Sequence, residues 1–247
     1  MALGGLRAVM LQALHPLAMA AVAQHSDYRT DPWGRLRRTA QYVSTVTYGT
    51  TSEAERAAAR VRAVHARLSG TEPESGTPYR VDDPALLLWV HCAEIDSFLT
   101  AYVRCGGRLG RGEGDQYVAE QVRGAELVGI DTRDCPTSSP ELRDYFRAIR
   151  PQLRATAEAR TALRFVLFPP MPLPARPAWM ALASTGFGLM PAWARARYGL
   201  PGVISANPCA GHAATASARS LRALSRLVPE HVRASPARRA AMERIAS

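Results

Sequence analysis

The sequence contains no lysine, so all 31 of its basic residues are arginine. The formal net charge of +10 would suit a nucleic acid or an anionic membrane surface as partner. The arginines are spread along the chain, however, and no known nucleic-acid-reading motif accompanies them. Uniform use of arginine beside so much alanine and glycine is typical of a GC-rich genome. We therefore expect a basic, solvated surface and no nucleic-acid partner.

Cysteine is also scarce and widely spaced. The four cysteines are Cys92, Cys105, Cys135 and Cys209, and no two of them form a CxxC pair. This spacing argues against a zinc ribbon and against a dense disulfide framework. Cys92 lies within an apolar stretch and is expected to be a buried free thiol. A reducing, cytoplasmic location fits this cysteine usage best.

Several motifs of common enzyme classes are missing. The sequence has no HExxH zinc pair, no GxSxG elbow, no P-loop and no GxGxxG after a strand. The sequence therefore gives no support for a metalloprotease, a GxSxG hydrolase, a kinase or a Rossmann-type dinucleotide-binding protein. The glycine-rich stretch from residue 106 to residue 114 follows no strand, and we expect a flexible loop there.

Long hydrophobic runs are few. Residues 8–23 resemble a signal peptide, with Arg7 before the apolar run and Ala21-Val22-Ala23 as a possible cleavage site. His15-Pro16 interrupts this run, which is too short to cross a bilayer, so a buried helix is favoured. We predict no transmembrane segment. A peripheral membrane contact stays open, and the oligomeric state is not indicated.

Alternating β-branched runs are nearly absent, while alanine, leucine and arginine dominate. This pattern predicts an all-α fold in a single globular multi-helix domain. Helices are expected at about 6–24, bent or broken at Pro16, at 32–49, from a capping box at 52–55 through residue 65, at 84–105, 115–128, from 139 with a kink at Pro151, at 178–198, 213–228 and after 236. Loops are expected at 70–83 and at the proline-rich 168–177.

A cluster of polar residues stands out on two of these helices. Arg35 and Thr39 are four residues apart and share a helix face, with Arg38 beside them. His65 lies on the apolar side of the next helix. Cations, a hydroxyl and an imidazole in an apolar setting suit an anionic, metal-containing macrocycle such as haem. From the residues alone, a hydrogen-bonded core histidine is the commoner explanation for His65.

Two further readings stay open for this cluster. His91, like His65, lies on an apolar helix face where a core histidine is the ordinary case. Arg35 and Arg38 are of residue types that usually form a solvated face or ion pairs. Glu94 and Asp96 are the expected ion-pair partners, since a buried carboxylate is costly when unpaired.

The order of several sequence blocks resembles one known family. The blocks are LQALHPLAMAAVAQHSDYRTDPWGRLRRTAQYV, then YGT, RVRAVHARLSG, YRVDDPALLLWVH and the late WARARYGLP. They are similar to the oxygenase family that groups the fungal ER-bound oxygenase MpaB with bacterial latex clearing protein, a rubber oxygenase. The resemblance covers roughly residues 4–200 and is greatest to the family's actinobacterial members.

The resemblance implies a globin-like helical core that binds haem b. His65 resembles the proximal iron ligand, while Arg35 and Thr39 resemble an Arg/Thr pair that lines the pocket. Arg38 takes the place of a basic neighbour. The catalytic acidic residue upstream in rubber-cleaving members has no counterpart here, and His15 or His25 is expected on the distal side instead. His91 is a second candidate for the iron ligand.

We therefore expect a haem-dependent oxygenase or peroxygenase that uses dioxygen or peroxide on an apolar, isoprenoid-like or lipid-like substrate. Its catalytic domain would span residues 1–205, with residues 206–247 as a helical extension of the same unit. One alternative is a non-catalytic haem-binding or lipid-binding protein on the same scaffold. Another is a haem-free helical domain in which the same arginines and histidines form structural ion pairs.

Overall fold

The computed structural model describes residues 2–200, 208–229 and 235–246. Helices make up most of this part of the chain, and the only strands within it form one short hairpin. The predicted all-α fold is confirmed. The expected boundary between residues 205 and 206 lies outside the described residues.

Two helices packed against each other form the centre of the fold. They are α1 (Ala2–Gln12) and α5 (Pro84–Arg104). They approach closely at Gly4, where an added Cβ would lie 2.6 Å from the Phe98 ring. Arg7 is buried between them and donates hydrogen bonds to Asp96 at 2.7 Å and to Ser97 at 2.6 Å. A buried cation is tolerated when it is paired in this way, so this contact fixes α1 against α5.

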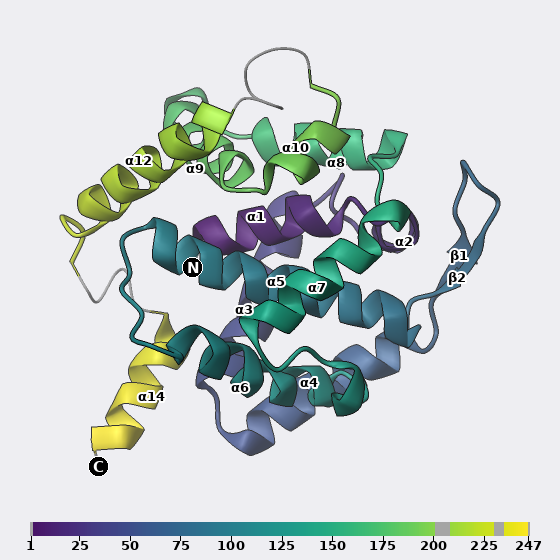
Figure 1. Cartoon of the computed structure of the whole chain (residues 1–247), viewed down its shortest axis with the longest axis horizontal. Coiled ribbons are helices and arrows are strands. Elements are labelled where there is room, and N and C mark those ends of the chain that lie inside the picture. Colours follow the sequence, from purple (N-terminus) through teal and green to yellow (C-terminus); the bar gives the residue numbers. More distant parts are fainter. Residues whose placement is uncertain (1, 201–207, 230–234, 247) are drawn as a thin grey trace.

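The other helices surround this pair in two groups (Figure 1). On the upper side of the view lie α8 (Ala157–Leu167), α9 (Arg176–Gly188), α10 (Ala192–Arg197) and α12 (Pro208–Ser225). On the lower side lie α3 (Pro32–Tyr48), α4 (Thr51–His65) and α6 (Glu113–Leu127). The remaining helices are α2 (Pro16–His25), α7 (Ser139–Ile149) and α14 (Pro236–Ala246), together with the short 3₁₀ turns Thr132–Asp134, Arg150–Gln152 and Leu173–Ala175.

Side-chain caps start the helices that flank the cavity described below. Asp31 accepts a hydrogen bond from the Gly34 backbone N–H at 2.8 Å, and Asp83 accepts one from Ala85 at 2.8 Å. Each cap is followed by proline at the first helical position, as the sequence predicts. The prediction for α4 was wrong in register: its capping box is formed by Thr50 and Glu53, so the helix begins at Thr51.

Proline divides three segments of the chain. The predicted bend or break at Pro16 is a break: the segment forms two helices, α1 and α2, at 106° to each other. The predicted kink at Pro151 is the end of α7, and α8 is a separate helix. Pro191 separates α9 from α10. In each case proline lacks the N–H that would continue the helix.

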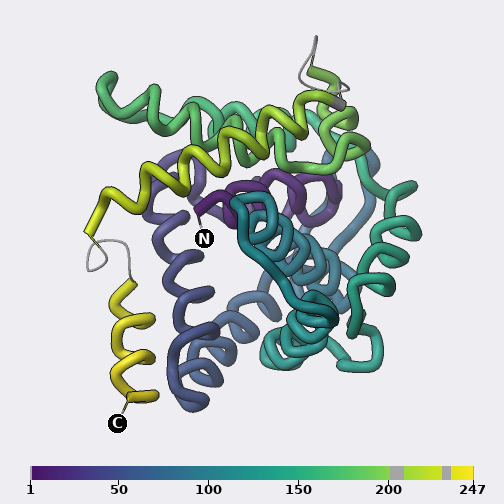
Figure 2. The backbone as a smooth tube through the Cα atoms, turned by 60° about the vertical axis from the view of Figure 1, so that its left-hand side comes forward, coloured from purple at the N-terminus to yellow at the C-terminus, as the bar shows by residue number. Residues whose placement is uncertain are grey.

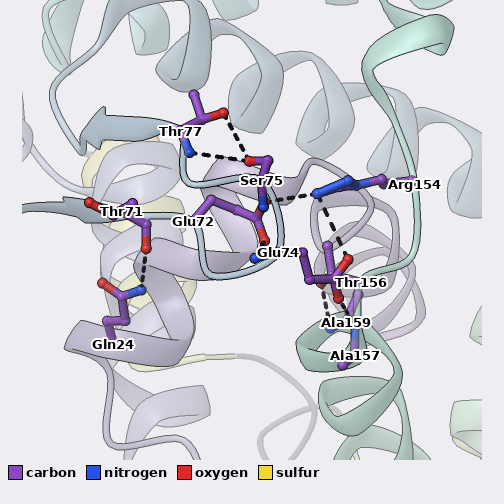
Figure 3. Close-up of polar contacts among 10 residues, drawn as sticks. All are labelled: Gln24, Thr71, Glu72, Glu74, Ser75, Thr77, Arg154, Thr156, Ala157 and Ala159. Carbon is purple, nitrogen blue, oxygen red and sulfur yellow. Dashed lines mark hydrogen bonds and ion pairs between the residues drawn. The ribbon is translucent and has the colours of Figure 1, made fainter.

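The expected 70–83 loop contains a hairpin that the sequence analysis missed. Strands β1 (Ser69–Thr71) and β2 (Pro78–Arg80) pair antiparallel, with Gly70 opposite Tyr79. Figure 3 shows how the hairpin is fixed: the Glu72 carboxylate accepts from Arg154 at 2.8 Å, and Glu74 accepts from the Ala157 N–H at 2.7 Å. The hairpin is therefore bound to the start of α8.

The apolar character of α5 follows from its central place. By length and composition α5 could cross a membrane, and the bent pair α1–α2 would be a second candidate if it is counted as one span. α5 packs against α1, α6 and α12, and the core helix of a globular fold meets the same criterion. Trp89 and Cys92 on this helix are fully buried, and Cys92 is a free thiol as predicted.

Candidate active site

A cavity of about 1390 Å³ lies among α3, α4, α5 and α6 and extends to α12. Figure 2 shows the backbones of α3 and α5 apart from each other, with α4 below them. Small-molecule pockets usually measure roughly 300–1,000 Å³. The cavity therefore has room for a large cofactor together with a substrate.

The cavity brings five of the predicted site residues together. Its lining includes Arg35, Arg38 and Thr39 from α3, His65 from the end of α4, and His91 from α5. The expected one-face arrangement on α3 is present, and the Thr39 hydroxyl donates to the Arg35 carbonyl oxygen at 3.1 Å. Arg35 and His91, which are 56 positions apart in sequence, thus line the same cavity.

The two arginines of α3 differ in their ion pairing. Arg38 donates to Asp27 at 2.5 and 2.6 Å and to Asp31 at 3.4 Å, and these contacts raise its pKa. Arg35 has no ion pair or side-chain hydrogen bond within the described part of the chain. Desolvation by the surrounding wall lowers the pKa of Arg35. The Asp27 carboxylate raises this pKa, whereas the Arg38 cation lowers it further. Of the two arginines, Arg35 is the one left available to an anionic ligand.

The predicted ion-pair partners of these arginines were wrong. Asp96 pairs with Arg7 of α1 and faces the core contact, not α3. Glu94 lines the cavity and pairs with neither arginine. The partners of Arg38 are instead Asp27 and Asp31, which lie just before α3 in sequence.

His65 stands at the end of α4 as a neutral imidazole. Burial lowers its pKa, and the nearby Arg35 cation lowers it further, opposed by Asp82. Its Nδ1 atom is buried and has no hydrogen-bond partner in the structure. A buried polar atom without a partner is costly, so a bound group that satisfies this ring would stabilise the site.

His91 and Glu94 add two further ionisable groups to the α5 wall. Burial lowers the pKa of His91 to about 4 and raises the pKa of Glu94 to about 7. Glu94 was not among the site residues predicted from the sequence. The available signal was its spacing of three residues from His91 within an apolar helix, which puts both side chains on one face.

Apolar side chains form most of the remaining wall. Val64 on α4 is 55% exposed, and Tyr102 on α5 is 50% exposed, yet both line the cavity. Other apolar lining residues come from α3, α5 and α12: Val43, Val46, Leu87, Val90, Ile95, Phe98, Leu99 and Leu221. These faces would be solvated without a ligand, which is a property of binding cavities rather than of a packed core.

His15 and His25 lie away from this cavity. His15 is buried beside Trp89, with ring centroids 6.2 Å apart. His25 contacts the Ser69 carbonyl oxygen at 3.1 Å and the Tyr79 hydroxyl at 3.3 Å, at the base of the hairpin. Neither residue lines the cavity, so the proposed function assigns no distal role to His15 or His25.

Within the described residues, no group of three or more His, Cys, Asp or Glu side chains is arranged to hold a metal ion. A metal bound by side chains alone thus has no candidate position there. A metal carried by a macrocycle needs only one or two protein ligands, and the cavity offers His65 and His91 for that purpose.

Comparison with known proteins gives one match. The family model described as ER-bound oxygenase mpaB/B′/rubber oxygenase, catalytic domain, matches residues 1–230. No curated protein and no solved structure matches the chain. The matched range includes every residue that lines the cavity.

Proposed function

The chain belongs to the ER-bound oxygenase mpaB/B′/rubber oxygenase family and is an oxygenase; from this premise we propose that it binds haem b in the α3–α6 cavity and oxidises an apolar substrate. The observation that supports the proposal is the convergence of Arg35, Thr39 and His65 on one cavity of about 1390 Å³. The expected co-substrate is dioxygen or peroxide.

The residues of the cavity fit the chemistry of a haem. Iron ligation requires a neutral imidazole, and burial lowers the pKa of His65 so that its ring is neutral at pH 7. Haem propionates are anionic, and Arg35 is a cation without another partner among the described residues. The apolar side chains of α3 and α5 suit the faces of a macrocycle.

Each polar residue then has a distinct role. His65 is the proposed iron ligand and Arg35 the proposed partner of a propionate. Thr39 already donates to the Arg35 carbonyl oxygen, so its hydroxyl oxygen is available to accept a hydrogen bond from a ligand. Arg38 holds the turn before α3 through its ion pair with Asp27.

When bound, haem supplies the redox-active iron that activates dioxygen or peroxide. The chain's own contribution is to exclude water and hold the substrate near that iron. We place the substrate in the arm of the cavity toward α12, which we define by the lining residues Leu3, Leu182 and Leu221; Arg222 and Ser225 of α12 also line the cavity. The three leucines favour a hydrocarbon chain, such as that of an isoprenoid or a lipid, over a sugar or a nucleotide.

Purification after haem supplementation, followed by metal analysis and an oxygen electrode, tests this proposal. We expect about one iron per chain and oxygen uptake that depends on a long-chain alkene or isoprenoid. Iron without substrate-dependent uptake would favour a non-catalytic haem protein. Absence of bound haem would contradict the proposal.

A further inference from the structure

The α5 wall of the cavity carries two polar groups in an otherwise apolar stripe. His91 and Glu94 are three residues apart, so they share one face of the helix, and both line the cavity. We call them the His91–Glu94 pair. The residues on either side of the pair that also line the cavity are apolar: Leu87, Val90, Ile95, Phe98 and Leu99.

The pair has no side-chain partner among the described residues, unlike Trp89, Asp96 and Ser97 of the same helix. The Trp89 indole donates to the Gln12 carbonyl oxygen at 3.0 Å, and Asp96 and Ser97 both accept from Arg7. Within the described residues, neither His91 nor Glu94 makes a side-chain hydrogen bond or an ion pair. Both side chains are half-buried, and two neighbouring polar groups without a protein partner on an apolar cavity wall point to a ligand.

The charge state of the pair narrows the chemistry of that ligand. Burial keeps the His91 ring neutral at pH 7 and disfavours the charged form of Glu94. The phenols that face this region, Tyr42 of α3 and Tyr117 of α6, are also kept neutral by burial, which raises their pKa values. Below pH 7 the patch is uncharged, and its donors and acceptors suit a hydroxyl group better than an ion.

We propose that the His91–Glu94 pair binds a hydroxyl group on the apolar substrate, so that the preferred substrate class is a long-chain or isoprenoid alcohol rather than a bare hydrocarbon. The hydroxyl oxygen accepts from one member of the pair and its O–H donates to the other. The apolar remainder extends along the arm toward Leu221 of α12. This inference rests on the proposed function for the use of the cavity, but it does not depend on haem or on turnover.

A matched pair of probes tests it directly. Geraniol and the hydrocarbon that lacks only its hydroxyl, 2,6-dimethylocta-2,6-diene, are equilibrated with the purified protein, and bound probe is quantified by gas chromatography. We expect geraniol to bind at least tenfold more tightly, because the hydrocarbon leaves buried polar groups unsatisfied. Equal binding of the two probes would overturn the proposal.

Variants assign the preference to this position. Glu94→Leu should abolish the preference for geraniol, Glu94→Gln should retain most of it, and Glu55→Leu, on the exposed face of α4, should leave it unchanged. Retention of the full preference in Glu94→Leu would overturn the proposal. Glu94→Leu should also melt at a higher temperature than the parent at pH 8, since it removes an unpartnered carboxylate. A lower melting temperature would mean that Glu94 stabilises the fold, which contradicts a ligand-binding role.

The optical spectrum of each preparation separates this inference from the proposed function. Loss of the geraniol preference with an unchanged haem spectrum bears on the His91–Glu94 pair alone. A protein without a haem spectrum that still prefers geraniol contradicts the oxygenase mechanism but supports the alcohol site.

Discussion

Arg38 donates two hydrogen bonds from Nη2 to the carboxylate of Asp27, at 2.6 and 2.5 Å, across the turn that joins α2 to α3. The contact pairs Arg38 with a carboxylate, whereas Arg35, one turn earlier on the same helix, has no ion pair among the described residues. The two arginines look alike in sequence, and the structure gives them different roles.

The first prediction follows from this difference. Arg35→Gln should weaken haem binding about tenfold or more, because a charge-assisted hydrogen bond contributes roughly 1.5–3 kcal/mol. Arg38→Gln should weaken it less, since that guanidinium is already paired with Asp27. Titration of the haem-free variants with haem, followed by absorbance, measures both affinities. The reverse order of effects would show that Arg38 holds the propionate.

The second prediction concerns the pH dependence of stability through Glu94. Burial raises the pKa of Glu94 to about 7 in the folded chain, above its value of about 4.5 when unfolded. The unfolded chain therefore releases this proton first, and stability is lost as pH rises from about 4.5 to 7. Glu94→Gln should increase the free energy of unfolding by about 1–3 kcal/mol at pH 8. It should have little effect at pH 4, where both states are protonated.

Urea unfolding at the two pH values tests that sign. Glu120→Gln is the matched control, because this carboxylate is exposed on α6 and accepts only from Gln116. An equal gain for Glu94→Gln at pH 4 and pH 8 would show that titration of this carboxyl is not the cause.

The third prediction concerns the hairpin, where a carboxylate is buried with its partners. Burial alone would raise the pKa of Glu72, but hydrogen bonds from Ser75 and Arg154 outweigh it and hold the pKa at about 2. Stability from this group is therefore present above about pH 4.5 and is lost as pH falls toward 2. Glu72→Gln should lower the free energy of unfolding at pH 7 by about 2–3 kcal/mol.

Unfolding monitored by circular dichroism measures this loss, and haem affinity should not change, because Glu72 does not line the cavity. Stability is expected to change with pH in opposite directions for Glu72 and Glu94, although both carboxyls are desolvated. The directions differ because only Glu72 has hydrogen-bond donors around it.

Helices with strong local signals were predictable from the sequence. Asp31-Pro32 and Asp83-Pro84 cap and start α3 and α5 where expected, because the cap and the proline act within one turn. The hairpin was not predictable in the same way. Its strands are three residues each, and Arg154 and Ala157, far away in sequence, fix it in place.

The candidate site was predictable in part for a similar reason. Arg35, Arg38 and Thr39 share a face of one helix, and helical spacing alone shows that. The pairing of Arg38 with Asp27, and of Asp96 with Arg7, depends on how helices pack, which spacing does not show. Family resemblance indicated which polar residues to consider, but the cavity is what sets His65 and His91 apart from His15 and His25.

The central claim is that His65 ligates haem iron in the α3–α6 cavity. The most direct measurement is the visible spectrum of the haem-supplemented protein beside those of His65→Ala and His91→Ala. We expect a Soret band in the parent protein, its loss or a clear shift in His65→Ala, and its retention in His91→Ala. Absence of a Soret band from the parent, an unchanged band in His65→Ala, or its loss in His91→Ala alone would contradict the assignment.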